Sequence, residues 1–262
     1  AVATGTGAIY VAMKSLEIPK NSDVIMSAVT CSGNFSCITE QGLNPIIADS
    51  SINSYNTNLE NIKKKITKKT KAIVPVHWGG ASPEMSKIIK IAKNYNLHVV
   101  EDACMGIGSR INNKSPGTFG IVNAFSMHPL KSLNVMGDGG AVVTNNSKIY
   151  SWMKKYRNHG MINRDNIEFW GVNMRLQPLQ AVVASHRLDE LKKTIEFATS
   201  PGLPNLLSDI LDFINSVCSS LILAVIFETI KPGDTQFTVI FFFPYSRARL
   251  FDIAIIPAFD AA

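Results

Sequence analysis

FSMHPLK, at residues 125–131, ends a short apolar segment with Lys131, and the glycine-rich run GDGG follows at residues 137–140. Upstream, the apolar run LHVV at residues 97–100 is followed by an acidic pair that ends in Asp102. Short apolar runs bounded by polar residues and glycines are typical of buried strands. The chain therefore places an acid at the end of one expected strand and a lysine shortly after the next.

An acid and a lysine in these positions suit the chemistry of pyridoxal 5′-phosphate (PLP). Lys131 would form a Schiff base with the cofactor's aldehyde, and Asp102 would keep the pyridine nitrogen protonated so that the ring accepts electrons. Each residue also has a structural interpretation, as a surface lysine and as a helix cap or ion-pair partner. The glycine run after Lys131 favours the chemical interpretation, because it indicates a tight chain path around something bound.

Strand-like and helix-like segments alternate through residues 1–145, which predicts an α/β fold with a mostly parallel sheet and helices on both faces. Such sheets bind ligands at the carboxyl ends of their strands, so Asp102, Ser126 and Lys131 should converge there. The expected helices cover residues 5–16, 59–66 and 83–95, and the expected strands cover residues 23–29, 45–48, 71–76, 97–100, 121–125 and 141–144.

The sequence Thr4-Gly5-Thr6-Gly7 opens the first expected helix. Glycines let the backbone approach an anion, and the free amides at a helix N-terminus bind it, although a plain helix cap explains the same pattern. Ser126 strengthens the anion interpretation, because its hydroxyl follows a strand end five residues before Lys131. Gly5, Thr6 and Ser126 are therefore candidates for holding the cofactor's phosphate.

The 262 residues are 46% hydrophobic and 18% charged, a composition that supports a sizeable core. Part of the net charge of +6 comes from lysines crowded between residues 63 and 71, which form either a solvated face or an attractive surface for anionic substrates. The sequence has no nucleic-acid-binding motif, and its apolar runs fall short of the ~18 residues of a membrane-spanning helix. Neither nucleic acid nor a membrane is therefore an expected partner.

The cysteines, at positions 31, 37, 104 and 218, are scattered and include no C-x-x-C pair. This pattern indicates neither a metal site nor a disulfide framework. It fits a reducing compartment, and the sequence does not open with a signal peptide. The expected location is the cytoplasm.

Residues 1–197 are expected to form one large domain, mainly helical from residue 148 onward except for a polar loop near residues 163–166. Because no initiator Met precedes Ala1, this domain is expected to be truncated at its N-terminus. Residues 198–262, which mix Pro and Gly breaks with apolar runs at 221–227 and 239–243, have no assigned domain. They are a divergent small domain or sequence foreign to the parent fold, such as a shifted reading frame, and the abrupt change in composition favours the second.

Taken together, the motifs of residues 1–197 resemble those of the DegT/DnrJ/EryC1/StrS family of PLP-dependent sugar aminotransferases, which have the fold type I large domain with a seven-stranded type of sheet. Their order and spacing are highly specific. The matching pieces are TGT (4–6), AIVPVH (72–77), VEDA (100–103), GTFG (117–120), FS (125–126) with Lys131, GDGGAVVTN (137–145), RNHG (157–160) and GVNMRL (171–176).

The resemblance implies that Lys131 binds the cofactor and shuttles a proton, that Asp102 pairs with the pyridine nitrogen, and that Gly5, Thr6 and Ser126 hold the phosphate. Asn173 would reach the phosphate of the neighbouring subunit's cofactor, so the resemblance implies a homodimer with shared active sites. Family members take an amino group, usually from glutamate, and pass it to a keto sugar linked to a nucleotide.

The chain departs from the family pattern at several positions. Cys31 replaces the aromatic residue that stacks on the cofactor ring, and Met105 stands where a glutamine commonly bonds the cofactor's phenolic oxygen. Asp138 replaces the glutamate of the glycine run. The family's N-terminal segment and its C-terminal small domain have no recognisable counterpart.

Three functions are compatible with these residues. The first is a nucleotide-sugar transaminase, and the second is a truncated or non-catalytic relative that keeps the cofactor-binding domain but cannot turn over. The third, sugar 3-dehydration, ranks below both because relatives with that activity replace the lysine with histidine, and Lys131 is present. His77 is either a structural residue or a group that faces the substrate, and Trp78 is either a core or interface residue or a stacking platform.

Overall fold

The computed structural model describes residues 1–52, 54–198, 239–243 and 252–256. By its internal contacts the chain divides into a first unit, Ala1–Leu191, and a second unit, Lys192–Ala262. In the second unit, β9 (Val239–Phe243) pairs antiparallel with β10 (Asp252–Ile256). Cys218, the apolar run at residues 221–227 and most of the rest of residues 198–262 lie outside the described residues. The division into a domain of residues 1–197 and an unassigned segment stays a prediction.

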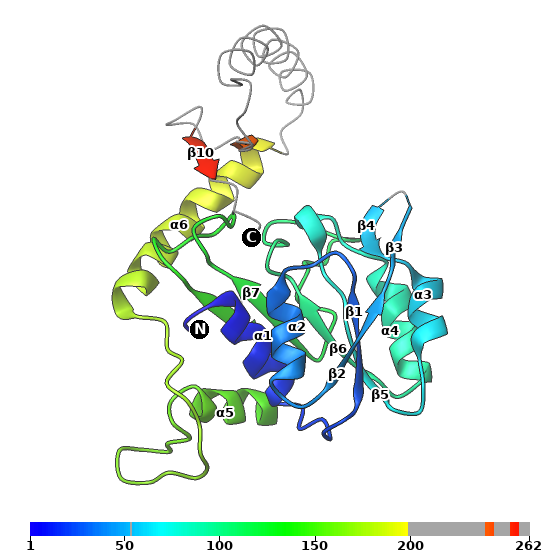
Figure 1. Cartoon of the computed structure of the whole chain (residues 1–262). Coiled ribbons are helices and arrows are strands. Elements are labelled where there is room, and N and C mark those ends of the chain that lie inside the picture. Colours follow the sequence, from blue (N-terminus) through cyan, green and yellow to red (C-terminus); the bar gives the residue numbers. More distant parts are fainter. Residues whose placement is uncertain (53, 199–238, 244–251, 257–262) are drawn as a thin grey trace, which may run out of the picture. The chain divides into compact units, whose positions relative to one another are not determined.

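A six-stranded sheet with the order β2-β1-β5-β6-β7-β8 forms the centre of the first unit (Figure 1). Its strands are β2 (Asn44–Ala48), β1 (Asp23–Ser27), β5 (Thr70–Val74), β6 (His98–Asp102), β7 (Val122–Ser126) and β8 (Gly140–Val143). The first five of these are parallel and β8 is antiparallel to β7, which confirms the mostly parallel sheet. Six strands, rather than the expected seven, form this sheet within the described residues. On the free side of β8, Val2 forms an isolated antiparallel bridge to Gly140 and no full strand.

Helices cover both faces of the sheet, as predicted (Figure 1). One face packs against α1 (Gly5–Lys14), α2 (Ser32–Thr39) and α5 (Ser147–Tyr156), and the other packs against α3 (Leu59–Lys65) and α4 (Met85–Asn94). Side chains of a strand alternate between faces, so Val24 and Met26 point to the first layer and Ile25 to the second. The buried strands explain why the sequence reads as short apolar runs.

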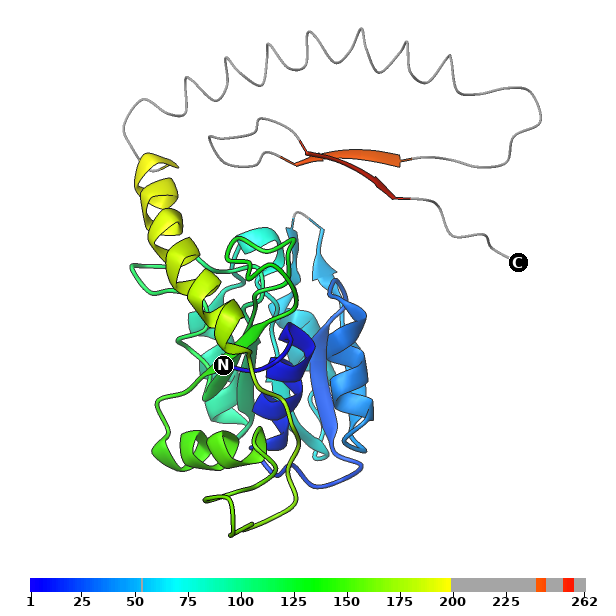
Figure 2. The same cartoon turned by 90° about the vertical axis from the view of Figure 1, so that its left-hand side faces the viewer.

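The helices depart from the expected pattern at two places. Residues 32–39 form α2, a helix that the sequence does not predict, because serine, asparagine and glycine there obscure the apolar spacing. Residues 148–197 are mainly helical with an interrupting loop, as expected, but the loop extends well beyond residues 163–166. Residues 157–177 form a long irregular connection between α5 and α6 (Pro178–Ala198), drawn in yellow-green in Figure 2. α5 ends at Tyr156, and the chain beyond it cannot continue as a helix through His159 and Gly160, whose φ values are 62° and 74°.

Smaller elements complete the first unit. The short strands β3 (Ser50–Ser51) and β4 (Ser54–Thr57) pair as a separate hairpin, and η1 (Trp78–Gly80) is a short 3₁₀ turn after β5. None of the helices within the described residues is long and apolar enough to cross a membrane.

Candidate active site

The carboxyl ends of the parallel strands meet at one edge of the sheet, where Asp102 ends β6 and Ser126 ends β7. The register places Asp102 beside Ala124 of β7. Asp102 is 4% exposed and Ser126 is 5% exposed, so both side chains lie in the interior of this edge. The structure thus places these two predicted residues at the position where α/β sheets bind ligands.

Two neutral groups hold the carboxylate of Asp102. The backbone N–H of Cys104 donates to Oδ1 at 3.1 Å, and Nδ2 of Asn34 donates to Oδ2 at 2.6 Å. Asn34 lies on α2 and is fully buried. Sequence reasoning missed Asn34, because it lies 68 residues from Asp102 on a helix that the apolar pattern did not reveal.

The N-terminus of α1 lies against Ser126. A Cβ added to Gly5 would fall 2.5 Å from Cβ of Ser126, so only glycine fits at this helix start. Thr4 caps the helix by accepting a hydrogen bond from the N–H of Gly7 at 2.8 Å. Because the first amides of a helix have no partners within it, this helix start can hold an anion beside the Ser126 hydroxyl.

Lys131 lies on the loop of residues 127–139, which joins β7 to β8 and is termed the lysine loop below. Its backbone N–H donates to the carbonyl of His128 at 2.8 Å, and its side chain is partly buried. Burial raises the pKa of the Cys104 thiol, the Asp102 charge raises it further, and the Lys131 ammonium opposes both. The Lys131 charge therefore lies within electrostatic range of the Cys104 thiol, which follows Asp102 by two residues.

The lysine loop is anchored to α6. An apolar cluster joins the loop to this helix and to the segment just before it. The loop contributes Met127, Leu133 and Val135, which pack against Leu176, Ala184 and Leu191. Nη2 of Arg187 also donates to Oδ1 of Asn134 at 3.0 Å, and Nε2 of Gln180 donates to the carbonyl of Asp138 at 2.6 Å. The helix therefore fixes the loop on either side of Lys131.

The other predicted residues lie around this centre. The Cβ position of Gly33 is 3.0 Å from Oγ1 of Thr6 and 3.4 Å from Sγ of Cys31, so Thr6 and the exposed Cys31 are near neighbours. Met105 is partly buried on the segment after β6. Asn173 is exposed and bridges to Asn158, and the adjacent Met174 packs against Gly7 of α1. The roles predicted for these residues stay predictions.

His77 is a structural residue. It is fully buried, and its ring nitrogens bond Oγ of Ser82 and Oε2 of Glu101, each at 2.8 Å. Glu101, also fully buried, accepts further hydrogen bonds from the N–H groups of Gly117, Phe119 and Gly120. Burial alone would raise the pKa of Glu101, but the bonds from His77, Gly120 and Gly117 hold it below its ordinary value. Both nitrogens of His77 are thus engaged, and its ring cannot face a substrate.

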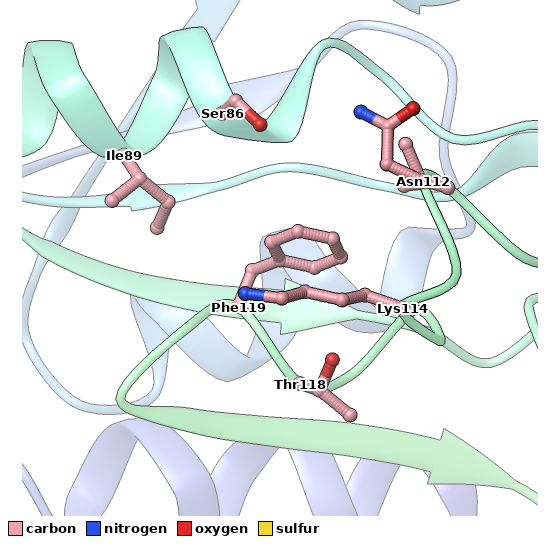
Figure 3. Close-up of a pocket in the computed structure, with 7 residues that line it drawn as sticks. Ser86, Ile89, Asn112, Lys114, Thr118 and Phe119 are labelled. Carbon is pink, nitrogen blue, oxygen red and sulfur yellow. The ribbon is translucent and has the colours of Figure 1, made fainter.

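A separate pocket of about 520 Å³ opens beside α4 (Figure 3). Phe119 lies between Lys114 and α4 in this view, and the Lys114 ammonium is 5.9 Å from the centre of the ring. The lining residues are Ser86, Ile89, Ile111, Asn112, Lys114, Thr118 and Phe119, none of which is a candidate site residue. No carboxylate lines this pocket, so it lacks the acid that the predicted chemistry needs, and the candidate site stays at the sheet edge.

The residues at the sheet edge fit PLP. A buried carboxylate with neutral donors suits a pyridinium nitrogen, and a glycine-opened helix start beside a serine suits a phosphate. In addition, Oδ1 of Asn34 is buried next to Asp102 without a hydrogen-bond partner. The site therefore contains a hydrogen-bond acceptor that the described residues leave unpaired. No group of metal-binding side chains occurs within the described residues.

The fold and this edge define the large domain of a fold type I aminotransferase, the class to which similar solved structures belong. The chain belongs to the DegT/DnrJ/EryC1/StrS aminotransferase family, whose model matches residues 1–199. The family and the fold class expected from the sequence are thereby confirmed.

Three known proteins illustrate the similarity. The chain is 35% identical over 181 residues to UDP-N-acetyl-3-dehydro-alpha-D-glucosamine 3-aminotransferase of Acidithiobacillus ferrooxidans, covering 69% of this chain and 49% of that protein. It is 37% identical over 190 residues to dTDP-3-amino-3,6-dideoxy-alpha-D-galactopyranose transaminase of Aneurinibacillus thermoaerophilus, covering 72% and 52%. The structure of NtdA from Bacillus subtilis with bound cofactor PMP matches with a TM-score of 0.68 and 30% identity, covering 72% and 43%. The chain spans about half the length of the curated relatives it matches.

Proposed function

We propose that this chain is the cofactor-binding part of a PLP-dependent aminotransferase that moves an amino group from an amino acid to a nucleotide-linked keto sugar. The observation that carries the proposal is that Asp102 and the Gly5–Ser126 contact share one edge of the sheet, with Lys131 on the loop that follows β7 at that edge. The named relatives, which include a UDP-sugar and a dTDP-sugar enzyme, support the substrate class.

Each of the site side chains has a separate proposed role. When bound, PLP supplies an aldehyde that condenses with an amine and a ring that accepts electrons. Lys131 carries that amine at Nζ and moves a proton to and from the substrate carbon. Asp102 holds the proton on the pyridine nitrogen, and Gly5, Thr6 and Ser126 bind the phosphate. Met105 would contact the cofactor without donating a hydrogen bond, because a thioether has no N–H or O–H group.

Both substrates are anionic. Glutamate is the proposed amino donor, and the acceptor carries the phosphates of its nucleotide. The net charge of +6 favours the approach of such molecules. Asn173 is exposed next to the start of α1, which supports a homodimer in which it reaches the partner subunit's phosphate site. The cytoplasm stays the predicted compartment.

One observation favours a second candidate, a catalytically incompetent homologue. Cys31 is exposed beside Thr6 and offers no ring to stack on the cofactor. In this alternative the chain keeps the fold and binds PLP weakly, without forming a bond to Lys131.

Borohydride trapping separates the two candidates. The full chain is mixed with PLP, reduced with sodium borohydride, digested and analysed by mass spectrometry. A pyridoxyl group on Lys131, lost when glutamate is added before reduction, supports the aminotransferase, because the donor removes the cofactor from the lysine. Lys131→Ala should abolish labelling, whereas Lys114→Ala, at the separate pocket, should not. Absence of label on Lys131 would favour the incompetent homologue.

A further inference from the structure

Asn34 of α2 makes two short hydrogen bonds, one to the end of β6 and one to the segment just before α2. Its Nδ2 donates to Oδ2 of Asp102 and to Oγ1 of Thr30, each at 2.6 Å. An ionised carboxylate only accepts hydrogen bonds, so the amide nitrogen must face Asp102. The orientation of the Asn34 amide is therefore set by Asp102.

This amide also fixes the carboxylate in return. Asn34 holds Oδ2 while the N–H of Cys104 holds Oδ1, so both oxygens are tied and the plane of the carboxylate is defined. Both donors are neutral, and no ion pair to Asp102 occurs within the described residues. The negative charge of Asp102 is thereby oriented without being neutralised, as a cationic ligand requires.

The remaining polar atom of Asn34 argues against a purely structural role. Its Oδ1 is buried and has no hydrogen-bond partner. Unpaired buried acceptors are costly, and asparagines that serve packing alone usually satisfy both ends of the amide. Asn34 instead uses its nitrogen twice and leaves its oxygen unpaired.

We propose that Asn34 is a positioning residue that holds the Asp102 carboxylate ready for the pyridine nitrogen of PLP. The proposal rests on the proposed function, because it requires the cofactor to bind at this edge. Asn34 acts through Asp102 and need not touch the substrate.

A double-mutant cycle on the full chain tests the proposal, with PLP affinity measured by fluorescence titration. Asn34→Ala should weaken PLP binding on the order of tenfold, the size expected for loss of a hydrogen bond to a charged group. In an Asp102→Asn background the same change should have little further effect, because the carboxylate that Asn34 positions is gone. Asn34→Leu, which keeps the volume, should behave like Asn34→Ala. Thermal unfolding without PLP identifies variants that fail to fold.

The chain offers a matched control. Asn44 donates to Oδ1 of Asp23 at 3.1 Å, and this asparagine–aspartate pair lies where β1 and β2 begin, at the edge of the sheet opposite Asp102. Asn44→Ala should therefore leave PLP affinity unchanged. Two outcomes would overturn the positioning role alone. One is an Asn34→Ala effect of the same size in the Asp102→Asn background, and the other is wild-type PLP affinity in folded Asn34 variants. Wild-type chain without PLP binding would overturn the proposed function and this inference together.

Discussion

Two adjacent acids at the end of β6 serve different purposes. Val99 and Val100 point to opposite layers of the sheet, and the alternation carries Glu101 to the α4 side and Asp102 to the α2 side. The Glu101 carboxylate accepts four hydrogen bonds, one from the His77 ring and three from the N–H groups of Gly117, Phe119 and Gly120. Asp102 instead lies on the α2 side, at the edge where the cofactor is proposed to bind.

We expect Glu101→Gln to destabilise the protein. The amide would keep one acceptor and turn its NH₂ group toward backbone N–H donors, so the free energy of unfolding at pH 7 should fall by about 3 kcal/mol. Because the pKa of Glu101 is lowered in the folded state, its stabilisation is complete above the ordinary value of 4.5 and is lost as pH falls through the folded pKa. Urea denaturation should therefore show wild type and variant converging below about pH 4.5. A difference that persists unchanged into acid would contradict this account.

The sequence indicated some site residues and concealed others. Lys131, Asp102 and Ser126 each follow an apolar run, and that placement marks the end of a buried strand. Asn34 acts through a contact between segments far apart in the chain, and no local pattern encodes such a contact. Glu101 was visible as half of an acidic pair, but its partners on residues 117–120 become neighbours only when the sheet forms.

At the scale of elements, α6 supports the lysine loop. Leu133 is 8% exposed in the cluster that joins the loop to Ala184 and Leu191, while Leu130 on the same loop is 75% exposed. The position of Lys131 therefore depends on packing several residues away from it.

Leu133→Ala should loosen this support. Removing the buried side chain should lower the free energy of unfolding by roughly 2–3 kcal/mol and speed amide hydrogen exchange in residues 127–139. Leu130→Ala is the matched control and should change neither quantity, because its side chain is exposed. Equal exchange rates in the two variants would show that the cluster does not hold the loop.

Helices and strands could be predicted where burial leaves a regular pattern of apolar residues in the sequence. The strands of the sheet were located to within a few residues, since both faces are covered and the apolar runs are continuous. The connection at residues 157–177 was not, because it is held by isolated bridges, such as Asn158 to Asn173, rather than by a repeating pattern.

At the scale of the whole molecule, the proposed homodimer has a direct test. If Asn173 serves the partner subunit's site, mixing Lys131→Ala chains with Asn173→Ala chains should restore the glutamate half-reaction, because one site of each mixed pair has both residues intact. Spectroscopy of the mixture after co-refolding measures the recovery. Two inactive parents that stay inactive when mixed would indicate that each subunit builds its own site.

The pairing of Val2 with Gly140 has a mechanical consequence. Two backbone hydrogen bonds, of 2.8 and 3.0 Å, join the first residues to the edge of β8, directly before the helix start at Gly5. A pulling force applied at the N-terminus would load these two bonds before it reached the parallel strands. In a single-molecule stretching experiment, the helix start would therefore detach in an early, low-force event while the rest of the sheet still resists.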